Sequence, residues 1–221
     1  MGSLFPQERR EVAPGAVHVP GWLDEGAQAR LLAACREWAR PPAGLETIVL
    51  PSGGVMSVRS VSLGWLWRPR RYVRVTRDGT PVKAFPDWLG DIGRRAVAEA
   101  YGPASGEAYR PDMALVNFYD DRARMGLHQD RYESGDDPVV SLSLGDTCVF
   151  RFGNTETRGR PWTDVELESG DLFVFGGPAR FAYHGVPKVL VGTAPAQLGL
   201  RGRLNVTIRV SGLGSPVRRP E

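Results

Sequence analysis

Cysteine is scarce in this chain of 221 residues, which contains only two. Two cysteines give neither a disulfide framework nor a zinc-binding spacing, and Cys35 and Cys148 lie in the apolar stretches LLAACREW and DTCVFRF. We therefore expect both to be buried free thiols.

Long apolar runs are also missing. No stretch reaches membrane-spanning length, and the N-terminal segment MGSLFPQERREV lacks the apolar core of a secretory signal peptide. Pro6 stands where the myristoylation pattern needs Ser or Thr. These absences predict a cytoplasmic protein with no membrane partner, and we expect a monomer.

The overall composition is ordinary. A hydrophobic content of 42% and a charged content of 24% are typical of a globular protein, and the length suits one domain. The formal net charge is only +3. The distribution of the charge is more informative, because arginines gather in one short stretch that also contains Trp65, Trp67 and Tyr72. The clustered arginines are Arg68, Arg70, Arg71, Arg74 and Arg77.

This mixture of arginines and aromatic rings has two interpretations. It suits a polyanion whose bases can stack, which is the chemistry of nucleic acids. The alternative is a solvated basic loop without a partner.

Two helices are predicted in the first half of the chain. The first spans 24–40, with Asp24 as its N-cap and Pro41-Pro42 at its end. The second spans 86–100, with Pro86 in its first turn and Gly102-Pro103 as the stop signal. The predicted buried faces are Ala27, Leu31, Ala34, Cys35 and Trp38 in the first helix, and Trp88, Leu89, Ile92, Ala96 and Val97 in the second.

The second half of the chain is rich in predicted strands. From Asp112 onward, short β-branched or aromatic segments alternate with Gly, Asp and Asn turns, a pattern typical of a sandwich or jelly roll and not of βαβ units. The predicted strands are MALVNFY, VVSLSLG, TCVFRF, DLFVFGG and RLNVTIRV.

Two histidines and an aspartate form a candidate metal site. His128 and Asp130 are two residues apart, so on an extended segment their side chains point the same way. His184, arriving from a distant strand, would complete a set of two histidines and one carboxylate. That set suits a non-haem Fe(II) oxygenase.

The segment RLNVTIR sharpens this interpretation. Polar Arg203, Asn205, Thr207 and Arg209 alternate with Leu204, Val206 and Ile208, as in a strand with one polar and one apolar face. Two inward arginines near a metal need an anion, and a dicarboxylate such as 2-oxoglutarate would meet them. A solvated strand face with surface arginines is the alternative.

Taken in order, these motifs resemble the AlkB family of Fe(II)- and 2-oxoglutarate-dependent dioxygenases. The resemblance runs from about residue 51 to residue 209. It rests on NFY at 117–119, MGLHQD at 125–130, GD at 170–171, GG at 176–177, YHG at 183–185 and the alternating strand 203–209, with PSGGVMSV at 51–58 and LGW at 63–65 upstream.

The resemblance implies an α+β, mainly β fold: a double-stranded β-helix (jelly roll) with N-terminal helices and a nucleotide-recognition lid. The single domain 1–221 would comprise an N-terminal extension and helix (about 1–45), the lid (46–85), a helix plus jelly-roll core (86–210) and a tail (211–221).

The resemblance also implies the roles of individual residues. Fe(II) would be held by His128, Asp130 and His184. The residues toward 2-oxoglutarate would be Asn117, Tyr119, Arg203, Asn205 and Arg209, and which arginine meets which carboxylate stays open. Base-binding residues would be Met56, Trp65, Tyr72, Tyr132, Glu133 and Arg158, with Trp65 stacking on the flipped base and Arg160 as an alternative to Arg158.

The chain departs from the familiar bacterial pattern in places that bear on base preference. Tyr132 stands where the family commonly has the first of two acidic residues, and Phe175 stands where Trp is familiar. The segment between Val58 and Trp65 is also shorter. These departures leave the iron chemistry unchanged.

The implied function is oxidative demethylation of N-alkylated bases in DNA, single-stranded or with a flipped base, with RNA as a further substrate. O2 is the co-substrate, 2-oxoglutarate is decarboxylated to succinate, and formaldehyde is released. Two other readings stay open. One is a dioxygenase of the same fold acting on RNA, protein or a small molecule, and the other is a non-catalytic nucleic-acid-binding jelly roll.

Overall fold

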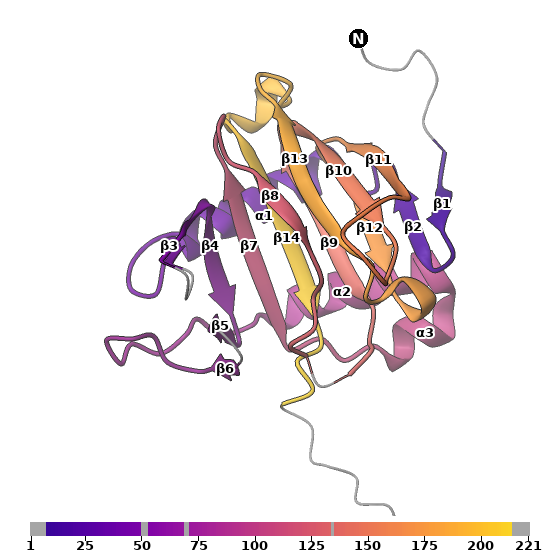
Figure 1. Ribbon diagram of the computed structural model, residues 1–221. Coiled ribbons are helices and arrows are strands. Elements are labelled where there is room, and N and C mark those ends of the chain that lie inside the picture. Colours follow the sequence, from indigo (N-terminus) through magenta and orange to yellow (C-terminus); the bar gives the residue numbers. More distant parts are fainter. Residues whose placement is uncertain (1–7, 50–52, 69–70, 134, 214–221) are drawn as a thin grey trace, which may run out of the picture.

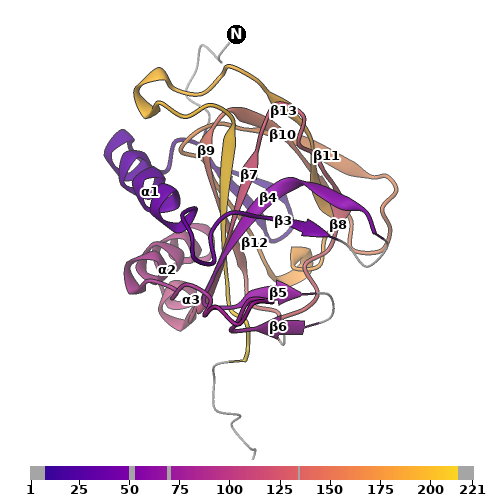
Figure 2. The same ribbon diagram turned by 90° about the vertical axis from the view of Figure 1, so that its left-hand side faces the viewer.

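The computed structural model describes residues 8–49, 53–68, 71–133 and 135–213 (Figure 1). Helices cover one face of a large sheet, and a smaller sheet lies against the other face (Figure 2). The motifs at 51–52, Arg70 and most of the predicted tail lie outside the described residues. Each helix within the described residues is too short or too polar to span a bilayer.

The large sheet has eight strands in the order β1-β2-β12-β9-β14-β7-β4-β3. All of its pairings are antiparallel. Its strands are β1 (Arg10–Ala13), β2 (Ala16–Val19), β3 (Glu46–Val49), β4 (Val55–Leu63), β7 (Met113–Tyr119), β9 (Val139–Gly145), β12 (Leu172–Phe175) and β14 (Arg203–Arg209).

The smaller sheet and a separate hairpin complete the β-structure. The four-stranded sheet has the order β11-β10-β13-β8 and is built from β8 (Met125–His128), β10 (Thr147–Gly153), β11 (Trp162–Leu167) and β13 (His184–Leu190). The hairpin pairs β5 (Leu66–Arg68) with β6 (Arg71–Val73). It lies below the end of β4 in Figure 1, at one end of the large sheet.

Three α-helices cover the outer face of the large sheet. The helix α1 (Glu25–Trp38) begins where predicted, because the side chain of Asp24 accepts a hydrogen bond from the backbone N–H of Ala27 at 2.7 Å. The helix α2 (Asp87–Tyr101) ends at Gly102, whose positive φ of 94° suits glycine. The predicted stop signal Gly102-Pro103 ends α2, but a second short helix, α3 (Pro103–Ala108), begins directly after Gly102.

Two hydrophobic cores result from this layering. The core between helices and large sheet contains Leu31, Leu89 and Val97 from the helices and Leu204, Val206 and Ile208 from β14. The core between the two sheets is rich in phenylalanine, with Phe150, Phe152, Phe173 and Phe175 in mutual contact. The apolar face of β14 therefore closes one core while its polar face turns toward the space between the sheets.

The mainly β jelly-roll fold, both long helices and all five predicted strands are confirmed. The thiols of Cys35 and Cys148 are buried and free, as expected. Two predictions need correction. Trp88 was placed on a buried face but is 41% exposed and stacks on Trp38. The segment before residue 24 was assigned to an extension, but β1 and β2 are strands of the large sheet.

The carboxylate of Asp171 ties β12 to the N-terminal strands. It accepts hydrogen bonds from His18 Nε2 at 2.8 Å, from the Gly21 N–H at 2.8 Å and from the Glu168 N–H at 2.9 Å. Both His18 and Asp171 are buried. Their contact therefore fixes the edge of the large sheet.

We expect Asp171→Ala to lower the free energy of unfolding by about 3–5 kcal/mol, because buried donors lose their common acceptor. Asp164→Ala is the matched control: it removes an exposed carboxylate paired with Arg151 and should cost less than about 1 kcal/mol. Denaturant unfolding of both variants measures the difference, and equal midpoints would show that the Asp171 contacts add nothing to stability.

Candidate metal centre and substrate cleft

The three predicted metal ligands come together where β8 meets β13. His128 is the last residue of β8 and His184 the first of β13, and the two are directly opposite in the strand register. A Cβ atom on Gly185 would lie 2.6 Å from the carbonyl oxygen of Met125. Glycine at this position therefore lets β8 approach closely enough to bring the two imidazole centroids within 4.5 Å.

The ligand atoms point into one small volume. His128 Nε2 lies 3.7 Å from Asp130 Oδ1, and His184 Nε2 lies 3.6 Å from Asp130 Oδ2. One ligand atom from each residue falls within 4.8 Å of the others. The Nδ1 atoms are held at 3.0 Å by the carbonyl oxygens of Gly126 and Ala182, which leaves both Nε2 atoms for a metal.

The charges at this site favour metal binding at neutral pH. Burial raises the pKa of Asp130, but the positive charge of Arg209, joined at low pH by that of the two protonated histidines, outweighs burial and holds that pKa at about 2. Burial and the neighbouring His128 lower the pKa of His184 to about 4. The carboxylate is therefore ionised and the His184 ring neutral, as metal ligation requires.

Arg203 and Arg209 are buried on the inner face of β14, with exposed fractions of 1% and 8%. Arg203 donates to Ser143 Oγ at 2.9 Å, and Arg209 Nη2 lies 2.7 Å from Asp130 Oδ2. The alternative of a solvated strand face is therefore wrong.

Among the described residues, the Nε atoms of both arginines are buried without a hydrogen-bond partner. Both arginines line a small cavity of about 40 Å³ together with His128, Asp130 and His184. Unpartnered guanidinium donors beside a metal-binding triad fit a carboxylate ligand, because a buried cationic donor needs an anion. The residues present thus fit Fe(II) and 2-oxoglutarate.

The other residues predicted toward the co-substrate also line this cavity: Asn117, Tyr119 and Asn205. Their amides are oriented by neighbours, since Ser60 Oγ donates to Asn117 Oδ1 at 2.7 Å and Asn205 Nδ2 donates to Ser141 Oγ at 2.7 Å. Burial raises the pKa of Tyr119, so its hydroxyl stays protonated as a donor.

A larger cleft of about 620 Å³ lies beside the small cavity. The two share the lining residues Asn117, Met125, His128, Asp130 and Arg209, so the cleft leads to the triad. Five of the six predicted base-binding residues line it: Met56, Trp65, Tyr72, Tyr132 and Arg158.

The sixth, Glu133, does not line the cleft. Its carboxylate is buried between Arg180 and Arg209, at 3.2 and 2.9 Å. The positive charge of Arg209 and the hydrogen bonds from Tyr72 and Arg209 lower the pKa of Glu133 against the opposing effect of burial.

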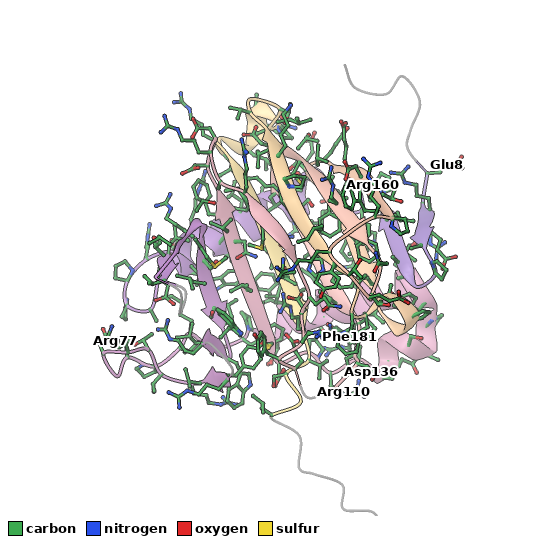
Figure 3. All side chains as sticks on the ribbon, viewed as in Figure 1. Glu8, Arg77, Arg110, Asp136, Arg160 and Phe181 are labelled. Atoms are coloured by element: carbon green, nitrogen blue, oxygen red, sulfur yellow. The ribbon has the colours of Figure 1, made fainter. Side chains whose placement is uncertain are left out.

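Among the described residues, part of the arginine cluster contacts other side chains of the protein and part is exposed. The guanidinium of Arg74 lies over the ring of Trp65, 4.0 Å from its centroid, and Asp112 accepts a hydrogen bond from the Trp65 indole at 3.1 Å. Arg68 lies 3.7 Å from Glu46. Arg71 and Arg77 are exposed, and Figure 3 shows Arg77 at the outer end of the loop that follows β6.

Sequence reasoning missed Arg180, although it is among the most deeply buried large side chains of the described chain. It donates from Nε to the carbonyl oxygen of Asp137 at 2.7 Å and from Nη1 to the carbonyl oxygen of Asp130 at 2.8 Å. Arg180 therefore secures the loop that carries the metal ligand Asp130. Its position after the GGPA turn offered no periodic pattern from which burial could be inferred.

We expect His184→Ala or Asp130→Ala to lose Fe(II) binding and turnover while the fold is retained, because each removes a metal ligand. His18→Gln is the control: it alters the third histidine, should lower stability, and should leave the Fe(II) affinity unchanged. Anaerobic Fe(II) titration with circular dichroism of each variant separates the two effects. Tight Fe(II) binding by a folded His184→Ala protein would contradict the assignment.

We expect Arg203→Met to weaken 2-oxoglutarate binding by about 2–5 kcal/mol, because a buried carboxylate loses its charged partner. Arg151→Met is the control, since Arg151 forms an exposed ion pair with Asp164 at 2.7 Å. Anaerobic titration of the Fe(II)-loaded proteins gives both affinities. An unchanged affinity in a folded Arg203→Met protein would show that Arg203 does not meet the co-substrate.

Comparison with known proteins agrees with this geometry. Residues 15–209 match the model of the 2OG-Fe(II) oxygenase superfamily. The chain is 39% identical over 202 residues to an alpha-ketoglutarate-dependent dioxygenase AlkB homolog of Caulobacter vibrioides, covering 90% of this chain and 88% of that protein. It is 31% identical to the DNA N(6)-methyladenine demethylase ALKBH1D of Arabidopsis thaliana, covering 91% of this chain but only 50% of that protein.

A solved structure extends the comparison to three dimensions. The structure of OsALKBH1 superimposes with a TM-score of 0.83 at 32% sequence identity, covering 92% of this chain and all of that one. The family match, the identities and the fold lead to one assignment. The chain belongs to the AlkB family of 2OG-Fe(II) oxygenases and is an Fe(II)- and 2-oxoglutarate-dependent dioxygenase.

Proposed function

We infer that this enzyme oxidatively demethylates N-alkylated bases in DNA. The observation that carries this inference is the cleft of about 620 Å³ that leads to the triad and has nucleic-acid chemistry on its walls. The name of the Arabidopsis relative, a DNA N(6)-methyladenine demethylase, supports the same substrate class. A base reaches such a site only when it is unpaired or flipped out of the duplex.

The cleft combines aromatic walls with basic side chains. Trp65, Trp67 and Tyr72 supply rings on which a base can stack. Arg74 and Asp112 hold the Trp65 ring from two directions, so it is a rigid platform. Arg124, Arg131 and Arg158 also line the cleft and suit the phosphates that flank the flipped nucleotide.

The chemistry follows from the ligand set. Fe(II) held by His128, Asp130 and His184, together with 2-oxoglutarate, would supply the oxidative chemistry: O2 would hydroxylate the N-methyl group while 2-oxoglutarate is converted to succinate and CO2. The C–N bond of the hydroxymethyl group then breaks and formaldehyde leaves; the nitrogen keeps the electron pair of that bond, and the hydroxyl proton is released to water from a cationic base or replaces the lost carbon on the nitrogen of a neutral one. The protein's own residues hold the co-substrate and orient the base, and no acid–base side chain is required.

A specific aromatic contact bears on which bases are accepted. Tyr132 is 50% exposed and packs against Trp67, with ring centroids 5.7 Å apart. Glu133 is held by arginines outside the cleft lining, and Asp130 is the single acidic residue that lines the described cleft. The cleft therefore offers no free carboxylate to a positively charged methylated base.

The proposed function is tested with single-stranded DNA that carries one methylated base, followed by mass spectrometry of the base and assay of formaldehyde. We expect repair by the wild-type enzyme and none by His184→Ala, whose ligand set is incomplete. A matching RNA strand and a methylated peptide distinguish the alternative substrates. Succinate release stimulated by the peptide and not by DNA would overturn the proposal.

Base preference gives a separate prediction. We expect Tyr132→Asp to shift the ratio of kcat/KM toward cationic 1-methyladenine and 3-methylcytosine, and away from a neutral etheno adduct, by roughly tenfold for an interaction of about 1.4 kcal/mol. Tyr132→Phe keeps the ring and the neutral charge and should leave the ratio near that of the wild type. An unchanged ratio in Tyr132→Asp would show that this position does not set specificity.

A further inference from the structure

The carboxylate of Glu133 connects two regions that the sequence keeps far apart. Its Oε1 atom accepts a hydrogen bond from the hydroxyl of Tyr72 at 2.7 Å and another from Arg209 Nη1 at 2.9 Å. Tyr72 belongs to the β5–β6 hairpin at the cleft, whereas Arg209 lies on β14 in the co-substrate cavity. One oxygen atom thus joins the wall of the substrate cleft to the co-substrate site.

Glu133 is itself held firmly. Its second oxygen, Oε2, accepts from Arg180 Nη2 at 3.2 Å, and Arg180 also donates to the backbone carbonyls of Asp130 and Asp137. In Figure 3 the loop around Asp136 lies beside the turn that carries Phe181, in agreement with these contacts. The carboxylate cannot move without disturbing a buried guanidinium and the loop that carries Asp130.

The three nitrogen atoms of the Arg209 guanidinium have three different environments. Nη1 donates to Glu133, Nη2 lies 2.7 Å from Asp130 Oδ2, and the buried Nε has no partner among the described residues. The planar guanidinium holds these three donors in a fixed geometry. The contact with Glu133 therefore sets the direction in which the free N–H of Nε points.

We propose that Glu133 is a positioning residue which aims Arg209 and couples the Tyr72 hairpin to co-substrate binding. A base that presses the hairpin onto the cleft strengthens the bond from Tyr72 to Glu133 and thereby fixes Arg209. A bound co-substrate fixes Arg209 from the other side and so stabilises the hairpin. This coupling rests on the proposed function in one respect, because it takes the ligand of the cleft to be a nucleic acid.

Coupling between two sites is reciprocal, which makes the proposal measurable without turnover. The factor by which 2-oxoglutarate tightens binding of a methylated oligonucleotide must equal the factor by which the oligonucleotide tightens binding of 2-oxoglutarate. We expect this factor to be at least about fivefold in the Fe(II)-loaded enzyme.

The experiment measures both affinities under anaerobic conditions, with a fluorescent single-stranded oligonucleotide that carries one methylated base. Tyr72→Phe removes only the hydroxyl that donates a hydrogen bond to Glu133. Tyr183→Phe is the matched control, because Tyr183 also lines the cleft but has no hydrogen bond to Glu133. We expect the coupling factor to fall to about one in Tyr72→Phe and to keep its wild-type value in Tyr183→Phe.

Glu133→Gln gives a second readout that needs no nucleic acid. We expect it to weaken Fe(II) and 2-oxoglutarate binding by about 10–100-fold, because the support of Asp130 and Arg209 is disturbed. Glu133→Asp keeps the charge and should recover part of this loss. If Glu133 instead only contacts the base, neither affinity changes.

The outcomes separate the two proposals. A wild-type coupling factor of one, or an unchanged factor in Tyr72→Phe, overturns the coupling while repair activity stays intact. Failure to bind or repair any methylated strand overturns the proposed function, and the 2-oxoglutarate titrations of Glu133→Gln still decide the positioning role of Glu133.

Discussion

The buried ion pair between Asp130 and Arg209 is the constraint on which the site depends. A carboxylate that serves as a metal ligand must stay ionised although burial removes its water, and that requires a fixed positive neighbour. Arg209 supplies the charge at 2.7 Å from Asp130 Oδ2. Arg209 also pairs with Glu133, and Glu133 pairs with Arg180. In this cluster two arginines therefore face two carboxylates, and their charges balance.

The apolar layers keep this cluster out of water. Phe150 and Phe175 lie 5.9 and 4.9 Å from the His184 ring, measured between centroids, and both belong to the core between the two sheets. The low dielectric that they create strengthens the attraction between the buried charges and also penalises any one left unpaired. Phe175 therefore forms an apolar wall of the metal site.

Much of this site could be predicted from the sequence because β14 repeats with a period of two. The alternation of Arg203 to Arg209 determines which side chains face inward, whatever the neighbouring strands. By contrast, β13 reads HGVPKVL and contains both Gly and Pro, and β8 has only four residues, so neither has a clear strand pattern. That β8 and β13 are paired strands, with His128 opposite His184, is known only from the strand pairing in the structure.

The direction of a loop is what the sequence alone could not supply. Tyr132 and Glu133 are adjacent and follow the same metal ligand, and both were predicted to contact the base. In the structure Tyr132 lies in the cleft against Trp67, whereas Glu133 turns to the buried arginines. Arg180 is the cause, because its guanidinium donates to the carbonyl oxygens of Asp130 and Asp137 and to the Glu133 carboxylate, which draws Glu133 inward.

Because Tyr132 lies in the cleft and Glu133 among buried arginines, substitutions at the two positions have different consequences. A substitution at Tyr132 alters a half-exposed ring at the cleft and leaves the balance of buried charge intact. A substitution at Glu133 that removes its charge leaves Arg180 and Arg209 with one carboxylate fewer in a dry environment, which is costly for the whole site. A substitution at Tyr132 can therefore change the wall of the cleft without disturbing the iron centre, because the charge that the centre requires is carried by the next residue.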